Sequence, residues 1–338
     1  MTKSLVAAAL VGLGSIVTAP LHGQAPEQLI TFLRQSIGLD SAQLVLVERG
    51  EGVVKVLDTR DRRDVALFGI ITADVARAAY VAKALDFKNS LRAPSRTHFG
   101  IFSNPAIAAD VAAVTISMRD VEDMNDCRPG DCVVKLPATD MRRIHEETNW
   151  SENDIQAQLG AYARRRLVEY VTDYRARGDS AMAIYDDRGR LNVHASDAFA
   201  AMLAESPYVY QNVPSLGRYL AAYPREKLAG ATEVLFWSED AMPRLRPILS
   251  VTHQVVYTPP ELPGVTLIAA KQLYANHYFE AALDVTCVVE RGGSGSYLLV
   301  LRRYRFDNMP SGGLINIRGR AIGALRDQLL ADLRRLKP

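Results

Sequence analysis

Five β-rich segments in the last third of the chain decide the fold, and two of them read ILSVTHQVVY over 248–257 and VTLIAAKQLY over 265–274. β-Branched and other apolar residues dominate these runs, and Pro- or Gly-rich turns separate them, which is typical of consecutive antiparallel strands. The expected strands are Glu233–Trp237, Ile248–Tyr257, Val265–Tyr274, Phe279–Val289 and Tyr297–Phe306. We therefore predict an antiparallel meander.

An amphipathic helix follows the meander. Its apolar residues recur at helical spacing and form one stripe of Ile322, Leu325, Leu329, Leu333 and Leu336. A helix of about 20 residues spans about 30 Å, which is long enough to cover a sheet.

Before the meander, the block 137–225 changes to helical periodicity. Its longest expected helix starts near Ile155, after a capping-box-like Ser151 and Asp154, and stops at Gly178. The region before this block mixes both kinds of element. It predicts a helix over 29–37, a short helix capped by Asp40 or Ser41, a hairpin of 53–57 and 65–71, a helix over 73–85 and a strand over 97–103.

This order of elements resembles the helix-grip architecture of the START-like, or SRPBCC, superfamily over about 50–136 and 230–338. The resemblance implies an α+β fold, in which a curved antiparallel sheet packs on the long C-terminal helix with a lipophilic cavity between them. The block 137–225 departs from that compact pattern, and we interpret it as a helical insertion. The sequence thus predicts a single START-like α+β domain over 26–338. Two segments, 127–136 and 273–279, also resemble an uncharacterised family of exported bacterial proteins, which implies no reaction.

Residues 1–25 have the features of a secretory signal peptide. Lys3 precedes an apolar run from Leu5 to Val17, and the small residues Gly23 and Ala25 precede a candidate cleavage site. The run is shorter than the roughly 20 residues that a membrane-spanning helix needs. We therefore expect a soluble protein that is periplasmic or secreted from a bacterium.

The cysteines agree with export. Cys127 and Cys132 flank Arg128-Pro129-Gly130-Asp131, and Pro followed by Gly favours a type II turn that brings its flanks together on two strands. The sequence predicts a structural disulfide between them, because exported chains use cysteine in this way. Cys287 lies in an apolar strand and is expected to be a buried thiol.

The charge balance excludes nucleic acid as an expected partner. The chain has 40 Lys and Arg against 38 Asp and Glu, a formal net charge of +2, which provides no global field for attracting a polyanion. Basic residues do outnumber acidic ones between Arg302 and Lys337. This region could make a peripheral membrane contact with anionic lipid head groups, or it could be a solvated helix face paired with acidic residues elsewhere.

No complete catalytic motif is present in the sequence. The segment 145–149 reads HEETN and lacks the second His of a zinc-protease helix, and neither Ser215 nor Ser311 has the glycine-flanked turn of a hydrolase nucleophile. We expect no metal and no cofactor.

Polar residues on apolar strand faces are the remaining candidates. His253 and Lys271 each share strand parity with apolar neighbours, so each must be hydrogen-bonded or must line a wet cavity. The candidate ligand-binding residues of an apolar pocket are Lys271, Tyr274, His253 and Tyr257. If neighbouring strands bring His253, His277 and Glu280 together, these three could instead form a catalytic acid–base or metal site.

The sequence favours a non-enzymatic protein that binds or carries an apolar ligand, such as a lipid or an isoprenoid, between the sheet and the C-terminal helix. One alternative is a periplasmic hydrolase or cyclase-like enzyme that uses His253, His277 and Glu280 in the same cavity. Another is a cell-envelope interaction protein with a filled core. Convergence of the three polar side chains would favour the enzyme, and a filled core would favour the interaction protein.

Overall fold

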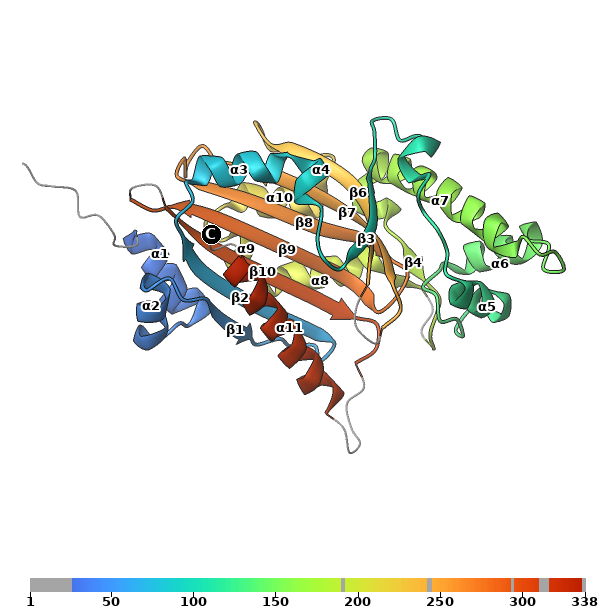
Figure 1. Cartoon of the computed structure of the whole chain (residues 1–338), viewed down its shortest axis with the longest axis horizontal. Coiled ribbons are helices and arrows are strands. Elements are labelled where there is room, and N and C mark those ends of the chain that lie inside the picture. The colour runs from blue at the N-terminus through green and yellow to red at the C-terminus, as the bar shows by residue number, and fades with distance from the viewer. Residues whose placement is uncertain (1–25, 190–191, 242–244, 293–294, 310–315, 336–338) are drawn as a thin grey trace, which may run out of the picture.

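One antiparallel sheet of eight strands organises the protein, in the order β1-β2-β10-β9-β8-β7-β6-β3 (Figure 1). The computed structural model describes residues 26–189, 192–241, 245–292, 295–309 and 316–335. The predicted meander is confirmed, because each of its strands pairs with the next one along the chain. Its strands are β6 (Thr232–Asp240), β7 (Ile248–Tyr257), β8 (Val265–Ala275), β9 (Phe279–Glu290) and β10 (Ser296–Phe306).

Earlier parts of the chain extend the meander at both edges. The predicted hairpin of β1 (Val53–Leu57) and β2 (Asp64–Ala73) joins through β2 to β10, and β3 (Arg96–Ile101) pairs with β6. Every residue of β2 is buried, as expected for a strand with a neighbour on each side and helices on both faces.

The C-terminal helix α11 (Ile317–Arg335) lies across one face of the sheet, over β1 and β2 (Figure 1). Leu329 and Leu333 are fully buried there, in one apolar cluster with Leu67 and Leu298. This arrangement confirms the predicted α+β class with a C-terminal helix on an antiparallel sheet, and the sheet is open. The last residue of the predicted stripe, Leu336, lies outside the described residues. Helices α3 (Arg77–Leu85) and α4 (Phe87–Ser90) lie on the same side as α11 (Figure 1).

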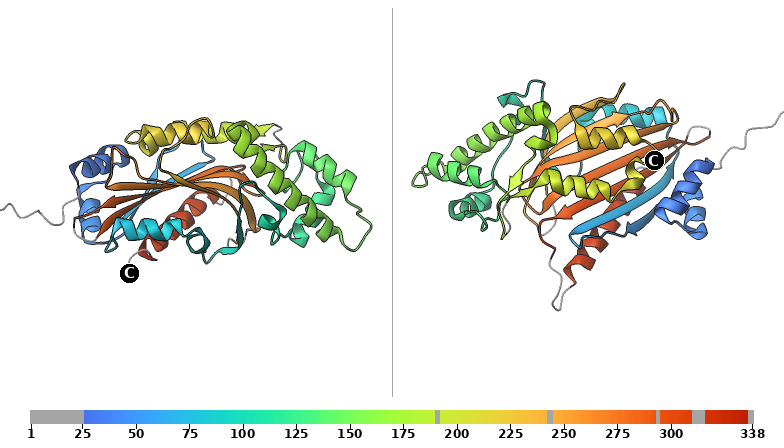
Figure 2. Two further views of the ribbon diagram at one scale, coloured as in Figure 1. Left: turned by 90° about the horizontal axis from the view of Figure 1, so that it is seen from above. Right: turned by 180° about the vertical axis from the view of Figure 1, so that it is seen from behind.

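Helices from the block 137–225 cover the opposite face, so the molecule has three layers (Figure 2). The largest apolar cluster lies between these helices and the meander, and it includes Phe199, Leu216 and Val251. The helices of this layer are α8 (Ala195–Ala204), α9 (Pro207–Tyr210) and α10 (Pro214–Ala222).

The remaining helices stand at the two ends of the sheet (Figure 1). At one end are α1 (Glu27–Phe32) and α2 (Ser41–Glu48), with a π-helical turn, Leu33–Ile37, between them. At the other end are α5 (Met118–Asp126), α6 (Ala138–Glu147) and α7 (Ile155–Arg177). Short elements complete the chain: the 3₁₀ turns Ala108–Val111 and Gly178–Ala181 and the two-stranded sheet of β4 (Ile184–Tyr185) and β5 (Val193–His194).

The predicted cap of α7 and the predicted start of α3 need correction, whereas α7 starts at Ile155 as predicted. Helix α7 ends before Gly178 as predicted, but Asp154 is its N-cap residue and its side chain makes no capping hydrogen bond, so there is no capping box. Helix α3 starts at Arg77 and not at residue 73, because β2 continues to Ala73.

The predicted disulfide is present, although its surroundings differ from the expectation. The Cα atoms of Cys127 and Cys132 are 4.5 Å apart, Gly130 has φ +86°, and the Asp131 N–H donates to the Arg128 carbonyl at 2.9 Å. The turn is therefore the predicted one. Its flanks are not two long strands, because Cys127 is the residue that ends α5. The disulfide thus fixes a turn to the end of a helix.

Within the described residues, no helix is both long enough and apolar enough to cross a membrane. The predicted signal peptide, residues 1–25, lies outside them.

Gly69 on β2 allows α11 to approach the sheet closely. A Cβ atom at this position would lie 2.8 Å from Leu333 Cδ1 and 3.2 Å from Leu329 Cδ2. We predict that Gly69→Ala lowers the free energy of unfolding by about 1–3 kcal/mol, because α11 has to move outward. Urea unfolding monitored by circular dichroism measures this change.

Gly323→Ala, on α11 itself, is the matched control. A Cβ atom there meets nothing within 4 Å, so the substitution should raise stability by up to about 1 kcal/mol through helix propensity. Equal effects of the two substitutions would contradict the close packing of α11 on β2.

Candidate ligand-binding groove

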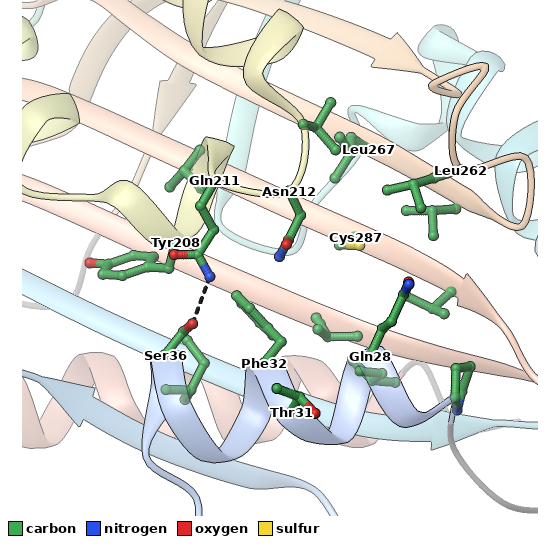
Figure 3. Close-up of a pocket in the computed structure, with 18 of the residues that line it drawn as sticks. Gln28, Thr31, Phe32, Ser36, Tyr208, Gln211, Asn212, Leu262, Leu267 and Cys287 are labelled. Atoms are coloured by element: carbon green, nitrogen blue, oxygen red, sulfur yellow. Dashed lines mark hydrogen bonds between the residues drawn. The ribbon is translucent and has the colours of Figure 1, made fainter.

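A groove of about 1050 Å³ lies between the sheet and the N-terminal helix (Figure 3). One wall is α1 with the following π-helical turn, and the other is α9 with the loop 211–213 and the turn between β7 and β8. The floor is apolar and consists of Phe68, Leu267, Val285, Cys287, Leu299 and Leu301.

This groove lies on the face of the sheet opposite α11. Side chains alternate along a strand, and Leu299 and Leu301 of β10 face the groove, whereas Leu298 and Val300 pack in the cluster with α11. The sequence predicted a cavity between the sheet and the C-terminal helix. In the structure that layer holds closely packed leucines over β2, and the large groove is on the other side.

The first wall is positioned by its own apolar side chains. Leu29 and Leu33 are buried in a cluster with Ile70 and Leu299 of the sheet, so the polar residues of α1 turn towards the groove and solvent. The π-helical turn ends at Gly38, which has φ +76° and so takes the left-handed conformation that glycine favours. Such turns are rare and often occur at functional sites.

Among the described residues, one hydrogen bond joins the two walls. Gln211 Nε2 donates to Ser36 Oγ at 2.6 Å, and this bond is exposed to solvent at the groove (Figure 3). Phe32 projects from the first wall beside this bond (Figure 3). Because a solvent-exposed hydrogen bond contributes little net stability, the walls can separate at this point at small cost.

One end of the groove is fixed by a buried arginine. Arg303 has no exposed surface, and its guanidinium donates to Tyr208 Oη at 3.2 Å and to Ser206 Oγ at 2.5 Å. It also forms ion pairs with Glu205 at 3.4 Å and Asp64 at 3.6 Å. The Tyr208 ring, which lines the groove, is thereby held in place, and the charge of Arg303 is already compensated.

Among the predicted site residues, His253 and Lys271 are direct cross-strand partners. His253 is buried; Tyr174 Oη lies 3.1 Å from its Nδ1, and Tyr219 Oη lies 3.1 Å from its Nε2. Glu233 Oε2 lies 3.5 Å from Nε2. A neutral ring satisfies all three partners when Nδ1 accepts from Tyr174 and the Nε2 proton is directed at Glu233 and Tyr219.

Burial lowers the pKa of His253 below its usual value, although the hydrogen bond and charge of Glu233 act in the opposite direction. The bond from His253 is the largest cause that lowers the pKa of Glu233 to about 2. Burial also lowers the pKa of Lys271, which is 1% exposed and donates to Asp179 Oδ1 at 2.5 Å and to the Leu220 carbonyl at 2.9 Å. The sequence predicted that each of these residues is either hydrogen-bonded or lines a wet cavity. Both His253 and Lys271 are hydrogen-bonded within the protein.

The two tyrosines predicted to bind ligand lie apart from the groove. Tyr257 is buried, with its hydroxyl 3.4 Å from Ser215 Oγ. Tyr274 donates to the Lys135 carbonyl at 3.2 Å and lines a second, smaller pocket of about 360 Å³ between α6, α7 and the end of β8.

The structure does not bring His253, His277 and Glu280 together. His277 Nε2 lies 3.1 Å from Asp120 Oδ1, and Glu280 accepts from Arg63 Nη1 at 2.9 Å, so the three belong to separate networks. No group of three or more His, Cys, Asp or Glu side chains in the described part of the chain could hold a metal ion. This geometry does not support the predicted acid–base site.

Several arginines of the basic C-terminal region are engaged within the protein. Arg302 pairs with Asp284 at 3.0 Å and with Asp332 at 2.7 Å, and Arg305 pairs with Asp64 at 2.7 Å. These contacts match the alternative in which basic residues of this region pair with acidic ones.

Sequence reasoning missed the residues that build the groove. In the segment 279–306, side chains alternate between the two faces of the sheet. This alternation places Val285, Cys287, Leu299 and Leu301 on the face opposite to that of their immediate neighbours, and it could have identified the floor. No local signal links Ser36 to Gln211, because they are far apart in the sequence.

Comparison with known proteins adds no family. The chain matches no family model and no curated protein. The START-like resemblance therefore stays a prediction from element order.

We predict that His253 makes stability fall as the pH decreases below about 6.5, the usual histidine pKa. The unfolded chain binds this proton while the folded chain does not, so folding stability is fully present above that pH and is lost below it. Between pH 7.5 and 5.5 the wild type should lose about 1 kcal/mol more than His253→Gln, measured by urea unfolding.

An identical decline in wild type and His253→Gln would show that His253 takes up its proton in the folded protein.

We also predict that Cys287 reacts slowly although it faces the groove. The residue is partly exposed and not fully buried as predicted. Desolvation by its apolar surroundings raises the pKa of its thiol to about 12. Since the thiolate is the reactive form, alkylation by iodoacetamide at pH 8 should be on the order of 100-fold slower in the folded chain than in urea. Equal rates, followed by mass spectrometry, would mean that the floor is well hydrated.

Proposed function

We propose that this is an exported protein that binds or carries an apolar ligand in the groove between α1, α9 and the sheet. The observation that carries the proposal is the apolar floor of a groove of about 1050 Å³. Ligand sites are concave and mostly apolar, with a few polar groups at their edges, and this groove has that character. The ligand is of the apolar class expected from the sequence, and its proposed site is on the face of the sheet opposite α11.

The absence of a reaction is part of this proposal, and it rests on how the polar residues are used. His253 and Lys271 are buried beneath α7, α8 and α10 and saturated with protein partners. Neither lines the groove. Groups held in this way stabilise the fold and are not available to a bound molecule.

Two observations support export. The disulfide between Cys127 and Cys132 is compatible with an oxidising compartment, and the first 25 residues have the pattern of a signal peptide.

Partly filling the groove should weaken the binding of an apolar ligand. We predict that the neutral dye N-phenyl-1-naphthylamine binds the wild type saturably with a rise in fluorescence. Cys287→Phe adds a ring to the centre of the floor (Figure 3) and should weaken this binding at least about tenfold.

Thr286→Phe is the matched control, because it adds a ring to the neighbouring residue, which points to the other face of β9. It should leave dye affinity within about twofold of the wild type, and urea unfolding checks that both variants are folded. Dye binding that survives Cys287→Phe would place the ligand elsewhere. No saturable binding to the wild type would reject the carrier function and favour the interaction protein.

A further inference from the structure

The rim of the groove is acidic. Three carboxylates line it, from Glu27 on α1, Glu261 in the turn between β7 and β8, and Glu290 at the end of β9, and all three residues are exposed. Among the described residues that line the groove there is no Lys, Arg or His. The side-chain charge at the rim is therefore of one sign.

From this arrangement we infer that the groove discriminates by head-group charge: it accepts long-chain molecules whose polar end is uncharged or cationic and disfavours anionic ones such as fatty acids. This inference rests on the proposed function, because it names the ligand class of the same groove.

Little nearby positive charge offsets these carboxylates. In the described part of the chain, neither Glu27 nor Glu261 forms an ion pair, and Glu290 has only a 3.6 Å contact with Arg77 while its side chain is 59% exposed. Arg303, which touches the lining residue Tyr208, is already paired with Glu205 and Asp64. A ligand carboxylate that entered the groove would meet side chains of the same charge. Among the described residues that line the groove, it would meet no basic side chain.

The other polar side chains that line the groove are neutral. Gln28 and Asn212 extend from opposite walls with their amide groups towards the groove (Figure 3). Thr31 and Ser36 add hydroxyl groups on the first wall. Amides and hydroxyls can donate to and accept from an alcohol, ester or amide without requiring a charge on the ligand.

The test measures displacement of N-phenyl-1-naphthylamine by dodecanol, dodecylamine and dodecanoate, which share a chain and differ in head group. At pH 7.5 and low ionic strength, we expect dodecanoate to displace the dye at least about tenfold more weakly than dodecanol. The difference should shrink as salt is added, because the rim charges are exposed and screened. Glu261→Lys should also shrink the ratio between dodecanoate and dodecanol.

Glu146→Lys is the matched control, since it makes the same charge change on the exposed surface of α6, at the far end of the molecule (Figure 1). It should leave the ratio unchanged. Dodecanoate binding as tightly as dodecanol, or an equal effect of the two Lys variants, would overturn the inference while dye binding still supported the groove as a ligand site. Failure of the dye to bind the wild type would instead reject the proposed function itself.

Discussion

The structure depends on an eight-stranded sheet that is apolar on both faces. A strand such as β2, in which every residue is buried, leaves neither face for water, so each face has to be covered by helices. Helix α11 covers one face over β1 and β2, and α8 to α10 cover much of the other. Between α1 and α9 the cover on this second face is incomplete, and the groove is the part of the apolar sheet that remains accessible. The candidate site thus follows from the way the helices are distributed over the sheet.

Buried charged and polar residues hold the second layer in register with the sheet. Lys271 reaches Asp179 and the Leu220 carbonyl, His253 reaches Tyr174 and Tyr219, and Arg303 reaches Glu205 and Ser206. A buried charge without partners would be strongly unfavourable, so each of these contacts defines one position of a helix over the sheet. For His253 and Lys271, the sequence predicts contacts with a ligand. Their role in the structure is to attach the helical layer, which leaves the groove floor to apolar side chains.

The sequence predicted the local elements well because their signals are local. The bounds of β7, 248–257, agree with the alternation and the turns that flank it, and Gly178 ends α7 as a positive-φ glycine does. The parity of His253 and Lys271 was also correct, and they are neighbours in the sheet. What failed depended on contacts between distant segments. The pairing of β2 with β10 and the position of α1 beside α9 arise from tertiary packing. For this reason the sequence predicts a cavity beneath α11, whereas the groove lies on the other face of the sheet.

Contacts with segments outside the meander explain why the structure does not support the enzyme alternative. His277 is bonded to α5 through Asp120, and Glu280 to the turn before β2 through Arg63. Strand order alone could not show this, because both partners come from outside the meander.

The central claim is that the groove holds an apolar molecule. The most direct test is native mass spectrometry of the protein purified from a bacterial periplasm, followed by solvent extraction. The account predicts a stoichiometric, lipophilic and non-anionic molecule that is released on unfolding. A chain that carries no such molecule, and that takes none up from an added lipid extract, would contradict it.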